Sequence, residues 1–478
     1  MKMMIGGKAV GAADGKTIEV INPATGAVID TIPAATPADI EHAVAEAVKG
    51  QKLWARVPVT QRVDIIYRFL ELVERDKEKL AQTLSAETGK PIREARAEIG
   101  NIPVSFRAFS EKAKHLYADV LPAGQEAGQE HTILITQREP IGVVACVIPF
   151  NFPCDLFDQK VAPALLAGNA AIVKPSTDNP LTLCMLTALL AEAGVTEGAI
   201  EIVTGRGSLV GNELCRNPQV HAITFTGSTS VGIETAHNAA DHLAHVALEL
   251  GGNDAFIVLE DGDVDLAVEE LIWGRMYNTG QVCCASKRFL VHESRKEEFT
   301  QKAIARIRQL KQGMPSDESS ELGCLISEKA AIEVERQIKE TLDEGGKLLL
   351  GGGRKGAFIE ATVLGDVPAS AAVASDMEIF GPVVPIISFK TTEEAIQIAN
   401  ASKFGLCGCV FTADMKMAWK VASALECGGA VINGASFFRS FEMPFGGYKY
   451  SGLGREGVAS TFDEVTQLKT IVLKNILA

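Results

Sequence analysis

The chain lacks a long apolar run, an export signal and a C-x-x-C pair. Its longest strongly apolar stretch, residues 141–150, is about half of the ~20 residues that a membrane-spanning helix needs, so we expect a buried strand there and no membrane partner. Residues 1–26 show neither an apolar core nor a small-residue cleavage site, a pattern that predicts a cytoplasmic protein. We therefore expect the ten cysteines to be reduced thiols.

Basic residues are also in deficit. The chain has 46 Lys and Arg against 60 Asp and Glu, a net charge of −14, and the two signs are interspersed without a basic stripe. This distribution predicts no nucleic-acid partner. His237, His242 and His245 are close in sequence, but the first is expected on a helix and the last near a strand. We therefore predict separate surface residues and no metal site.

What the sequence has is length and alternating patterns. At 478 residues with 47% hydrophobic content, it should form two or three packed units. Helical and strand-like segments alternate, which predicts an α/β fold with parallel sheets covered by helices on both faces. Short strands are predicted at 141–148, 170–173, 200–203, 222–225 and 256–258. The first four are separated by helix-sized intervals and form the candidate nucleotide-binding sheet.

Helix boundaries are marked by caps. The sequence Thr36-Pro37-Ala38-Asp39 predicts a capping box with proline in the first turn, and further helices are predicted at 60–74, 179–193 and 328–344. Residues 131–138 alternate apolar and polar side chains, as in a half-exposed antiparallel strand. With 467–473 they are expected to form a small projecting sheet, whose edges could extend sheets between subunits of a homodimer or homotetramer.

Three polar residues stand where chemistry is possible. Cys283 lies in the glycine-bearing loop 278–284, where a thiolate needs only modest activation to be a nucleophile. Glu249 ends an apolar strand, and its neighbours Ala247, Leu248 and Leu250 should raise its pKa towards that of a base at neutral pH. Asn151 is fixed between Phe and Pro residues, as an oxyanion donor should be. Considered one at a time, these residues more commonly have structural roles: a buried cysteine, an exposed Glu at a strand end and an Asn in a turn.

Two segments could bind a nucleotide. Residues 226–232 lead from the strand at 222–225 into a helix, and the free backbone N–H groups at that helix start can face a pyrophosphate. The segment is not the G-x-G-x-x-G fingerprint, so the bare pattern is weak. Lys174 directly follows the strand at 170–173, and the carboxyl ends of such strands are where these sheets bind nucleotides.

Together, seven segments in order resemble the aldehyde dehydrogenase superfamily over essentially the whole length: Pro-Phe-Asn-Phe-Pro at 149–153, Lys-Pro at 174–175, Phe-Thr-Gly-Ser at 225–228, Glu-Leu-Gly-Gly at 249–252, Gly-Gln-Val-Cys at 280–283, Glu-Ile-Phe-Gly-Pro at 378–382 and Pro-Phe-Gly-Gly at 444–447. The resemblance implies a Rossmann-like NAD(P)-binding domain (1–118 and 139–250), an α/β catalytic domain (251–449) and a small antiparallel oligomerisation segment (119–138 and 450–478).

The resemblance also implies residue roles in the oxidation of an aldehyde to its acid. Cys283 is the expected nucleophile, Asn151 and the Cys283 backbone N–H the oxyanion hole, and Glu249 the base for the water that releases the product. Lys174 and Glu378 are expected to hold the two ribose units, Gly227 and Ser228 the pyrophosphate, and Phe380 the nicotinamide ribose. Further cofactor contacts are expected from Phe150, Ser176 and Thr177.

Glu249 favours hydrolysis over transfer to coenzyme A, since the CoA-acylating branch of the superfamily generally differs there. Two alternatives stay open: a CoA-acylating enzyme, and a catalytically silent structural or binding member of the same fold. Against the second, a scaffold has no physical need for Cys283, Glu249, Asn151 and Lys174 together. Analysis of the products with and without CoA distinguishes the CoA-acylating enzyme from the hydrolytic one.

Cofactor choice depends on Thr177, three residues after Lys174. Relatives that prefer NAD often carry a glutamate there, which hydrogen-bonds the adenosine hydroxyls and repels a 2′-phosphate. A neutral hydroxyl removes the repulsion and leaves Lys174 free to attract phosphate. We therefore predict that NADP is accepted, with NAD as the alternative.

Residues 436–444 resemble the branch with lactaldehyde, glyceraldehyde and phosphonoacetaldehyde dehydrogenases. Arg439, where relatives line the substrate tunnel, could bind a carboxylate, phosphonate or hydroxyl, or instead form a salt bridge at a subunit contact. Phe152 and Phe445 are the other predicted substrate contacts. Succinate-semialdehyde enzymes usually have arginines in place of Gln159 and Tyr277, and phosphorylated-glyceraldehyde enzymes have one in place of Val282. A small hydroxy- or monoanionic aldehyde is therefore expected.

Overall fold

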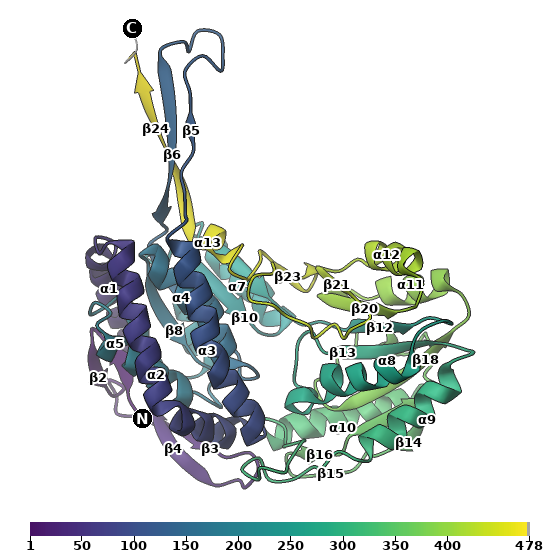
Figure 1. The fold of residues 1–478 in the computed structure, drawn as a ribbon. Helices are drawn as coiled ribbons and strands as arrows, with labels where there is room; N and C mark the ends of the chain where they lie inside the picture. The colour runs from purple at the N-terminus through teal and green to yellow at the C-terminus, as the bar shows by residue number, and fades with distance from the viewer. Residues whose placement is uncertain (476–478) are drawn as a thin grey trace.

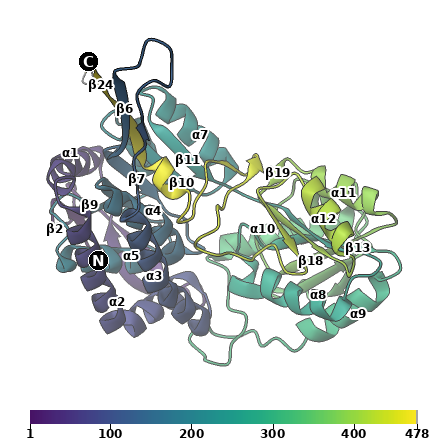
Figure 2. The same cartoon turned by 45° about the horizontal axis from the view of Figure 1, so that its top comes forward.

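A computed structural model describes residues 1–475 and shows two α/β lobes with an arm projecting from one of them (Figure 1). One lobe contains an eight-stranded sheet, the other a seven-stranded sheet, and the arm a three-stranded sheet. In the turned view of Figure 2 the two lobes again lie side by side, and in Figure 1 the chain near β23 runs between them. The α/β class predicted from the alternating patterns is confirmed.

The eight-stranded sheet has a parallel centre in the order β9-β8-β7-β10-β11. Numbered along the chain from β7, this is the order 3-2-1-4-5 of a dinucleotide-binding sheet, whose ligand crevice lies where the order reverses, between β7 and β10. The outer strands β1, β2 and β23 pair antiparallel. The strands are β1 Met3–Ile5, β2 Lys8–Val10, β7 Val143–Val147, β8 Ala170–Lys174, β9 Ile200–Ile202, β10 Ala222–Thr226, β11 His245–Glu249 and β23 Gly452–Leu453.

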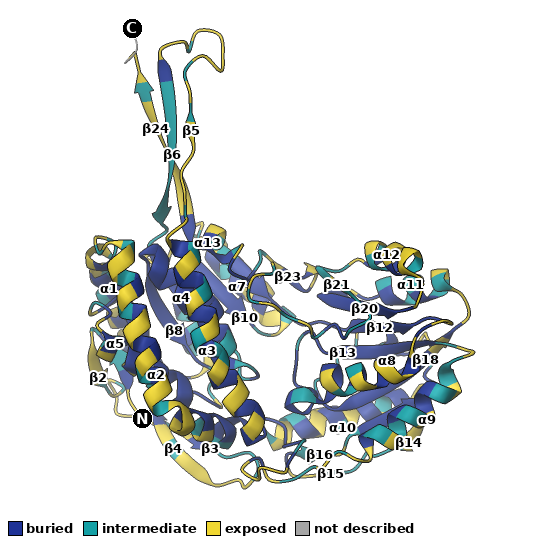
Figure 3. Ribbon diagram, in the orientation of Figure 1, coloured by how far each residue is buried: buried dark blue, intermediate teal, exposed yellow. Residues whose placement is uncertain are grey.

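Helices cover both faces of this sheet because its central strands are apolar on both sides. In β7, Val144 and Cys146 face the core under α2, α3, α4 and α5, whereas Val143 and Ala145 face the core under α1, α6 and α7. The dark interior strands of Figure 3 show this double covering. The helices are α1 Pro37–Trp54, α2 Val59–Thr88, α3 Ile92–Ala113, α4 Pro153–Ala167, α5 Leu181–Ala193, α6 Gly207–Arg216 and α7 Thr229–Ala240.

The second sheet is parallel except for β14 at one edge, in the order β14-β17-β18-β13-β12-β20-β21. Phe256 and Phe289 pack under α8 and α9, and the alternate residues Ile257 and Leu290 pack on the other face near α10, α11 and α12. The elements are β12 Asp254–Val258, α8 Val264–Leu271, β13 Ser286–His292, α9 Lys296–Ile307, α10 Glu328–Asp343, β14 Lys347–Leu350, β17 Thr362–Gly365, β18 Val383–Phe389, α11 Thr392–Asn400, β20 Cys407–Phe411, α12 Met415–Ala424 and β21 Gly429–Ile432.

The arm is formed by the antiparallel strands β5 (Val120–Leu121), β6 (Thr132–Pro140) and β24 (Thr466–Lys474). The β6–β24 register runs from Thr132 opposite Lys474 to Pro140 opposite Thr466, so the predicted pairing of the segments near residues 131 and 470 is confirmed. β23, from the 450–478 segment assigned to this sheet, instead pairs with β11. Short elements complete the fold: β3 Thr17–Ile21, β4 Val28–Pro33, β15 Arg354–Lys355, β16 Phe358–Ile359, β19 Phe404–Gly405, β22 Tyr448–Lys449 and α13 Thr461–Glu464.

The predicted helix starts agree well with the structure, and one helix length does not. Thr36 and Asp39 form the expected capping box at α1. The prediction of a helix ending at residue 74 is wrong, because α2 continues to Thr88 with Leu80 and Leu84 extending its buried stripe. Among residues 1–475, no helix is both long and apolar enough to cross a bilayer.

Candidate functional site

The loop after β8 carries a buried ammonium group. Lys174, the last residue of β8, is only 4% exposed, and its Nζ donates to the Pro175 carbonyl at 2.7 Å. Burial lowers the pKa of Lys174 to about 8. A buried cation with a neutral carbonyl as its hydrogen-bond partner suits a phosphate or a ribose hydroxyl. Nearby, the Thr177 hydroxyl donates to the Gly205 carbonyl at 3.0 Å, and Ser176 Oγ accepts from the Asp178 N–H.

The turn after β10 leads into α7, with Ser228 as its N-cap residue. The Gly227 N–H donates to the Glu249 carbonyl at 3.1 Å, which joins the ends of β10 and β11. A Cβ at Gly227 would lie 2.6 Å from the Phe225 ring, so a side chain at this position would require that ring to move. The helix start therefore presents free N–H groups at the edge of the sheet, as a pyrophosphate site requires.

Glu378 and Phe380 come from the other lobe. The Glu378 carboxylate accepts from Lys287 at 3.1 Å and from the Gly252 N–H at 3.2 Å. The Phe380 ring lies edge-on to Phe150, with 5.9 Å between ring centroids. Because Phe150 follows β7 and Phe380 precedes β18, these contacts bring predicted cofactor residues of both lobes together.

The loop before Cys283 has an unusual backbone. Asn278 and Thr279 have φ values of 50° and 53°, and Gly280 has 77°. These residues lie within a short turn (η2, Tyr277–Gly280) that follows a π-helical turn (η1, Ile272–Met276). Such angles are costly for residues with a Cβ. The Glu94 carboxylate holds the loop by accepting from the Asn278 N–H at 2.8 Å. The thiol is thus presented by a loop that the surrounding structure fixes.

Cys283 is partly exposed, and its thiol has an acidic character. A hydrogen bond with the Cys284 thiol, together with the positive charges of Lys287 and Arg439, lowers the pKa of Cys283 to about 7 against the effect of burial. Lys287 also donates a hydrogen bond to the Cys283 carbonyl. This lowered pKa favours the thiolate, the form that attacks carbonyl carbons.

Asn151 lies beside this loop and is 6% exposed. Its Nδ2 donates to the Gln281 carbonyl at 3.1 Å, which occupies one of the two amide hydrogens. Its backbone carbonyl accepts from Lys90 Nζ at 3.0 Å and from Asn278 Nδ2 at 2.9 Å. The main chain at Asn151 is thus held in place, and the side-chain amide, held by Gln281, has a second N–H to offer.

Glu249 is a buried carboxyl group at the end of β11. Neither of its carboxylate oxygens has a hydrogen-bond partner in residues 1–475. Burial and the negative charge of Glu456 raise its pKa well above the ordinary value, in the predicted direction. Although burial opposes ionisation of Glu456, the adjacent Lys160 (2.6 Å) and Arg439 (2.9 Å) lower its pKa. Glu249 therefore lies beside a compensated carboxylate while lacking a partner of its own.

A cavity of about 310 Å³ joins several predicted residues. This volume is at the small end of ligand pockets. Its polar wall contains Asn151, Cys283 and Arg439 with Asn101, Asp155 and Gln159, and its apolar wall is mainly aromatic, formed by Phe152, Trp273, Tyr277, Phe437 and Phe441 with Leu156 and Val282. Phe445 is not on this wall; it packs under the Arg439 guanidinium, 4.1 Å from the ring centroid.

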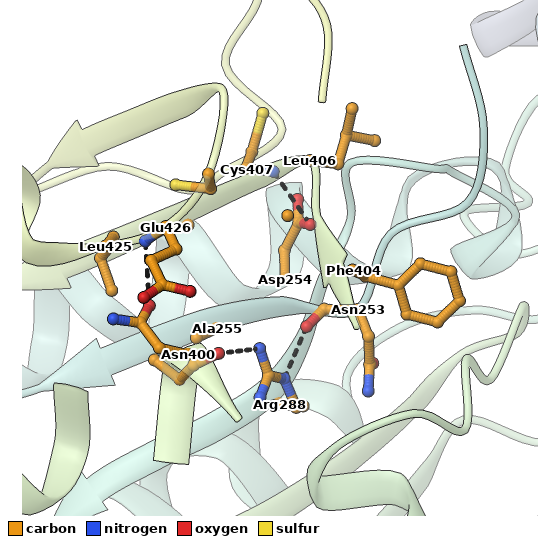
Figure 4. A pocket seen from close by; sticks show the side chains of 14 residues that line it. Asn253, Asp254, Ala255, Arg288, Asn400, Phe404, Leu406, Cys407, Leu425 and Glu426 are labelled. Atoms are coloured by element: carbon orange, nitrogen blue, oxygen red, sulfur yellow. Dashed lines mark hydrogen bonds between the residues drawn. The ribbon is translucent and has the colours of Figure 1, made fainter. Parts of the chain in front are cut away.

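A second cavity, drawn in Figure 4, contains the buried Asp254 and Arg288. Asp254 accepts from the Cys407 N–H at 3.1 Å, and Arg288 donates to the Asn253 carbonyl. Burial raises the pKa of Asp254 to about 8. With a volume of about 10 Å³, this space is of the order of one water molecule and is too small for a substrate.

The ion pair between Arg439 and Glu456 lies within one chain. Of the two interpretations of Arg439, its position on the cavity wall agrees with a substrate contact, and the salt bridge exists but needs no second subunit. The three histidines that are close in sequence lie on different elements. His237 lies in α7, His242 lies in the turn after α7, and His245 begins β11, where it pairs with Glu464.

Sequence reasoning missed the buried charges behind the site. Lys160 and Glu456 are 296 residues apart, so no periodicity connects them. Lys90 and Glu98 form a buried ion pair, and with Glu94 they recur every four residues around the start of α3. Residues four apart lie on the same face of a helix. This spacing could have indicated from the sequence that these charges lie together.

Comparison with known proteins agrees with this geometry. The model of the aldehyde dehydrogenase family matches residues 10–471. A lactaldehyde dehydrogenase of Methanococcus vannielii is 36% identical over 99% of this chain and 100% of its own length. A mitochondrial succinate-semialdehyde dehydrogenase of Oryza sativa is 37% identical, covering 99% and 89%.

Solved structures are equally similar. An NADP-dependent enzyme of E. coli has a TM-score of 0.96 at 34% identity, covering 99% of this chain and 98% of its own. An NAD-dependent aldehyde dehydrogenase of Sinorhizobium meliloti has the same score and identity, covering 99% and 95%. Because family model, relatives and structures agree over nearly the whole chain, we conclude that it belongs to the aldehyde dehydrogenase family of NAD(P)-dependent oxidoreductases.

Proposed function

We propose that this enzyme oxidises a small hydroxy- or monoanionic aldehyde to the carboxylic acid through a thioester on Cys283. The observation that carries the proposal is the placement of an acidic thiol and a fixed amide on one wall of a small cavity. The unpaired Glu249 nearby supplies a base. A thiol, an oxyanion donor and a base are the groups that covalent aldehyde oxidation needs.

In the first step the Cys283 thiolate attacks the aldehyde carbon and forms a thiohemiacetal. The negative charge that develops on the former carbonyl oxygen is received by the free N–H of Asn151 Nδ2 and by the Cys283 backbone N–H. Because Gln281 holds the Asn151 side-chain amide and Lys90 and Asn278 hold its backbone carbonyl, little reorganisation is needed as charge develops.

The cofactor residues fit a dinucleotide. Lys174 is a buried cation that forms no salt bridge within residues 1–475, and Gly227 keeps the turn before α7 free of a side chain. Lys174, Ser176 and Thr177 would hold the adenosine end, Gly227 and Ser228 the pyrophosphate, and Glu378, Phe380 and Phe150 the nicotinamide end. When bound, the nicotinamide supplies the hydride acceptor that turns the thiohemiacetal into a thioester.

In the last step Glu249 accepts a proton from the water that hydrolyses the thioester. Its pKa is raised by burial and by Glu456, so its carboxylate is a stronger base than an exposed one. Arg439 neutralises Glu456 and can donate further N–H groups towards the cavity. We propose that it contacts the polar end of the substrate, with Phe152 on the cavity wall and Phe445 supporting the guanidinium.

The test combines an aldehyde panel with cysteine variants. Reduced cofactor and acid product are measured for wild type, Cys283→Ser and Cys427→Ser, with NAD, with NADP and with added CoA. Cys427 is the matched control because it is the other partly exposed cysteine. We expect only the Cys283 variant to lose oxidation. Unchanged turnover in Cys283→Ser would refute the covalent mechanism. Formation of acyl-CoA in the presence of CoA would show that the acyl group is transferred to CoA and not to water.

We also propose that the arm mediates homo-oligomer formation. Val120, Leu468 and Val472 are apolar and exposed on it, and exposed apolar strand edges favour pairing with a second copy. Sedimentation of wild type and of Leu468→Lys/Val472→Lys tests this. A monomeric wild type would refute it.

A further inference from the structure

One polar patch on the cavity wall has no part in the proposed chemistry. Asp155 and Gln159 lie four residues apart on α4, so both project from the same helix face, and Asn101 of α3 stands beside them. All three line the same cavity as Cys283. They are therefore placed to contact a substrate held on that thiol.

Gln159 contributes unused hydrogen-bonding capacity to this patch. Its side chain is 1% exposed, and neither its Oε1 nor its Nε2 has a hydrogen-bond partner in residues 1–475. Leaving a buried amide unsatisfied is costly, and such groups are rare in folded proteins. A hydroxyl group, which both donates and accepts, can satisfy either atom, whereas an ammonium group can satisfy only Oε1.

Asp155 gives the patch its second polar group. Its carboxylate oxygens accept from Asn101 Nδ2 at 3.1 and 3.4 Å, and no cation within residues 1–475 forms a salt bridge with it. Burial raises the pKa of Asp155 to about 7. Around neutral pH this group can therefore either accept a hydrogen bond from a hydroxyl or donate one to it.

The charges around the cavity disfavour an anionic substrate tail. Arg439 is paired with Glu456, and Lys90 is paired with the fully buried Glu98. Each of these cations already has a carboxylate partner, although Arg439 shares Glu456 with Lys160. A carboxylate placed beside ionised Asp155 would therefore meet a like charge and would have to compete with Glu456 for Arg439. A neutral polar substituent avoids this cost.

We propose that Asp155, Gln159 and Asn101 form a hydroxyl-binding subsite that makes this enzyme select neutral hydroxyaldehydes over unsubstituted and carboxylate-bearing aldehydes. The inference rests on the proposed function, because it concerns the same cavity, and it narrows the substrate from hydroxy- or monoanionic aldehydes to the hydroxylated class. It also assigns the selectivity to residues outside the reacting groups.

The test compares kcat/KM for 2-hydroxypropanal and propanal, which differ by one hydroxyl, and adds succinic semialdehyde and 3-aminopropanal as anionic and cationic probes. We expect wild type to prefer 2-hydroxypropanal over propanal by about tenfold, the effect of one or two hydrogen bonds. In Gln159→Leu, similar in size but without the amide, the ratio should fall towards one. Asp155→Asn is a second variant, and Gln82→Leu, at an exposed site on α2, is the control with an unchanged ratio.

Each outcome decides the inference. A ratio that falls in both cavity variants but not in Gln82→Leu supports the subsite. If wild type oxidises both propanals equally, or prefers succinic semialdehyde or 3-aminopropanal, the subsite is refuted while aldehyde oxidation stands. If reduced cofactor forms with none of the four aldehydes, the proposed function itself fails.

Discussion

Removing the charge of Lys287 should make the Cys283 thiol less acidic. Lys287 is 1% exposed, donates to the Cys283 carbonyl and forms a salt bridge with Glu378. Its positive charge is one of the causes that lower the pKa of Cys283 to about 7, after the hydrogen bond from Cys284. In Lys287→Met the hydrogen bond between Cys284 and Cys283 stays, whereas the positive charge of Lys287 is lost. The pKa of the Cys283 thiol should therefore rise.

The magnitude follows from the geometry. An ammonium bound to the carbonyl of Cys283 lies ~6 Å from the sulfur of the same residue. Two unit charges at that distance interact by about 0.7 kcal/mol in water and about 2.8 kcal/mol at the effective dielectric constant of a protein surface. At 1.36 kcal/mol per pH unit, the titration midpoint of Cys283 should move upwards by about 0.5 to 2 pH units.

The assay is the rate of Cys283 alkylation by iodoacetamide against pH, without cofactor or aldehyde. Thiolate is the reactive form, so in wild type the rate should fall as the pH drops through about 7, and in Lys287→Met it should fall at higher pH. Lys287→Arg keeps the charge and is the control, expected near the wild-type midpoint. A midpoint in Lys287→Met that equals the wild-type value would refute the electrostatic reasoning.

Three other substitutions separate the remaining roles. Glu249→Gln should release a burst of about one equivalent of reduced cofactor and then turn over at least about 100-fold more slowly; a stopped-flow trace without a burst would contradict the role of Glu249 in hydrolysis. Thr177→Glu should raise KM for NADP by about tenfold or more through repulsion of the 2′-phosphate, with KM for NAD as the comparison. Gly280→Ala should lower the free energy of unfolding in urea by about 2 kcal/mol, because φ is 77° and a Cβ would overlap the Gly381 backbone; an unchanged midpoint would contradict this.

Local signals predicted much of the fold. The capping box at Thr36 and the short Val/Ile runs of β8 and β10 depend on a few adjacent residues, and the structure has them where expected. The strand order 3-2-1-4-5 depends on pairing between distant segments, for which periodicity carries no information. The same holds for the length of α2, whose second half is stabilised by tertiary packing rather than by a visible stop signal.

The sequence could predict those residues of the candidate site whose chemical groups identify them, such as a thiol, an amide or a guanidinium. Cys283, Asn151 and Arg439 do lie on one cavity. The sequence could not show which charged side chains form ion pairs. Arg439 pairs with Glu456. Glu456 lies in the segment after β22 and also pairs with Lys160 of α4, so the pairing depends on how this segment packs against α4.

The pattern of paired charges bears on the proposed role of Glu249 as the base. Lys160, Lys287 and Lys90 each have a carboxylate partner, namely Glu456, Glu378 and Glu98. Had any of these ammonium groups been aimed at Glu249 instead, the ion pair would have stabilised its carboxylate and lowered its basicity. Burial and the charge of Glu456 raise the pKa of Glu249, and the positive charges of Arg439 and Lys160 oppose this rise without reversing it. The buried salt bridges contribute little to the stability of the fold, and they leave the Glu249 carboxyl group without an ion pair of its own.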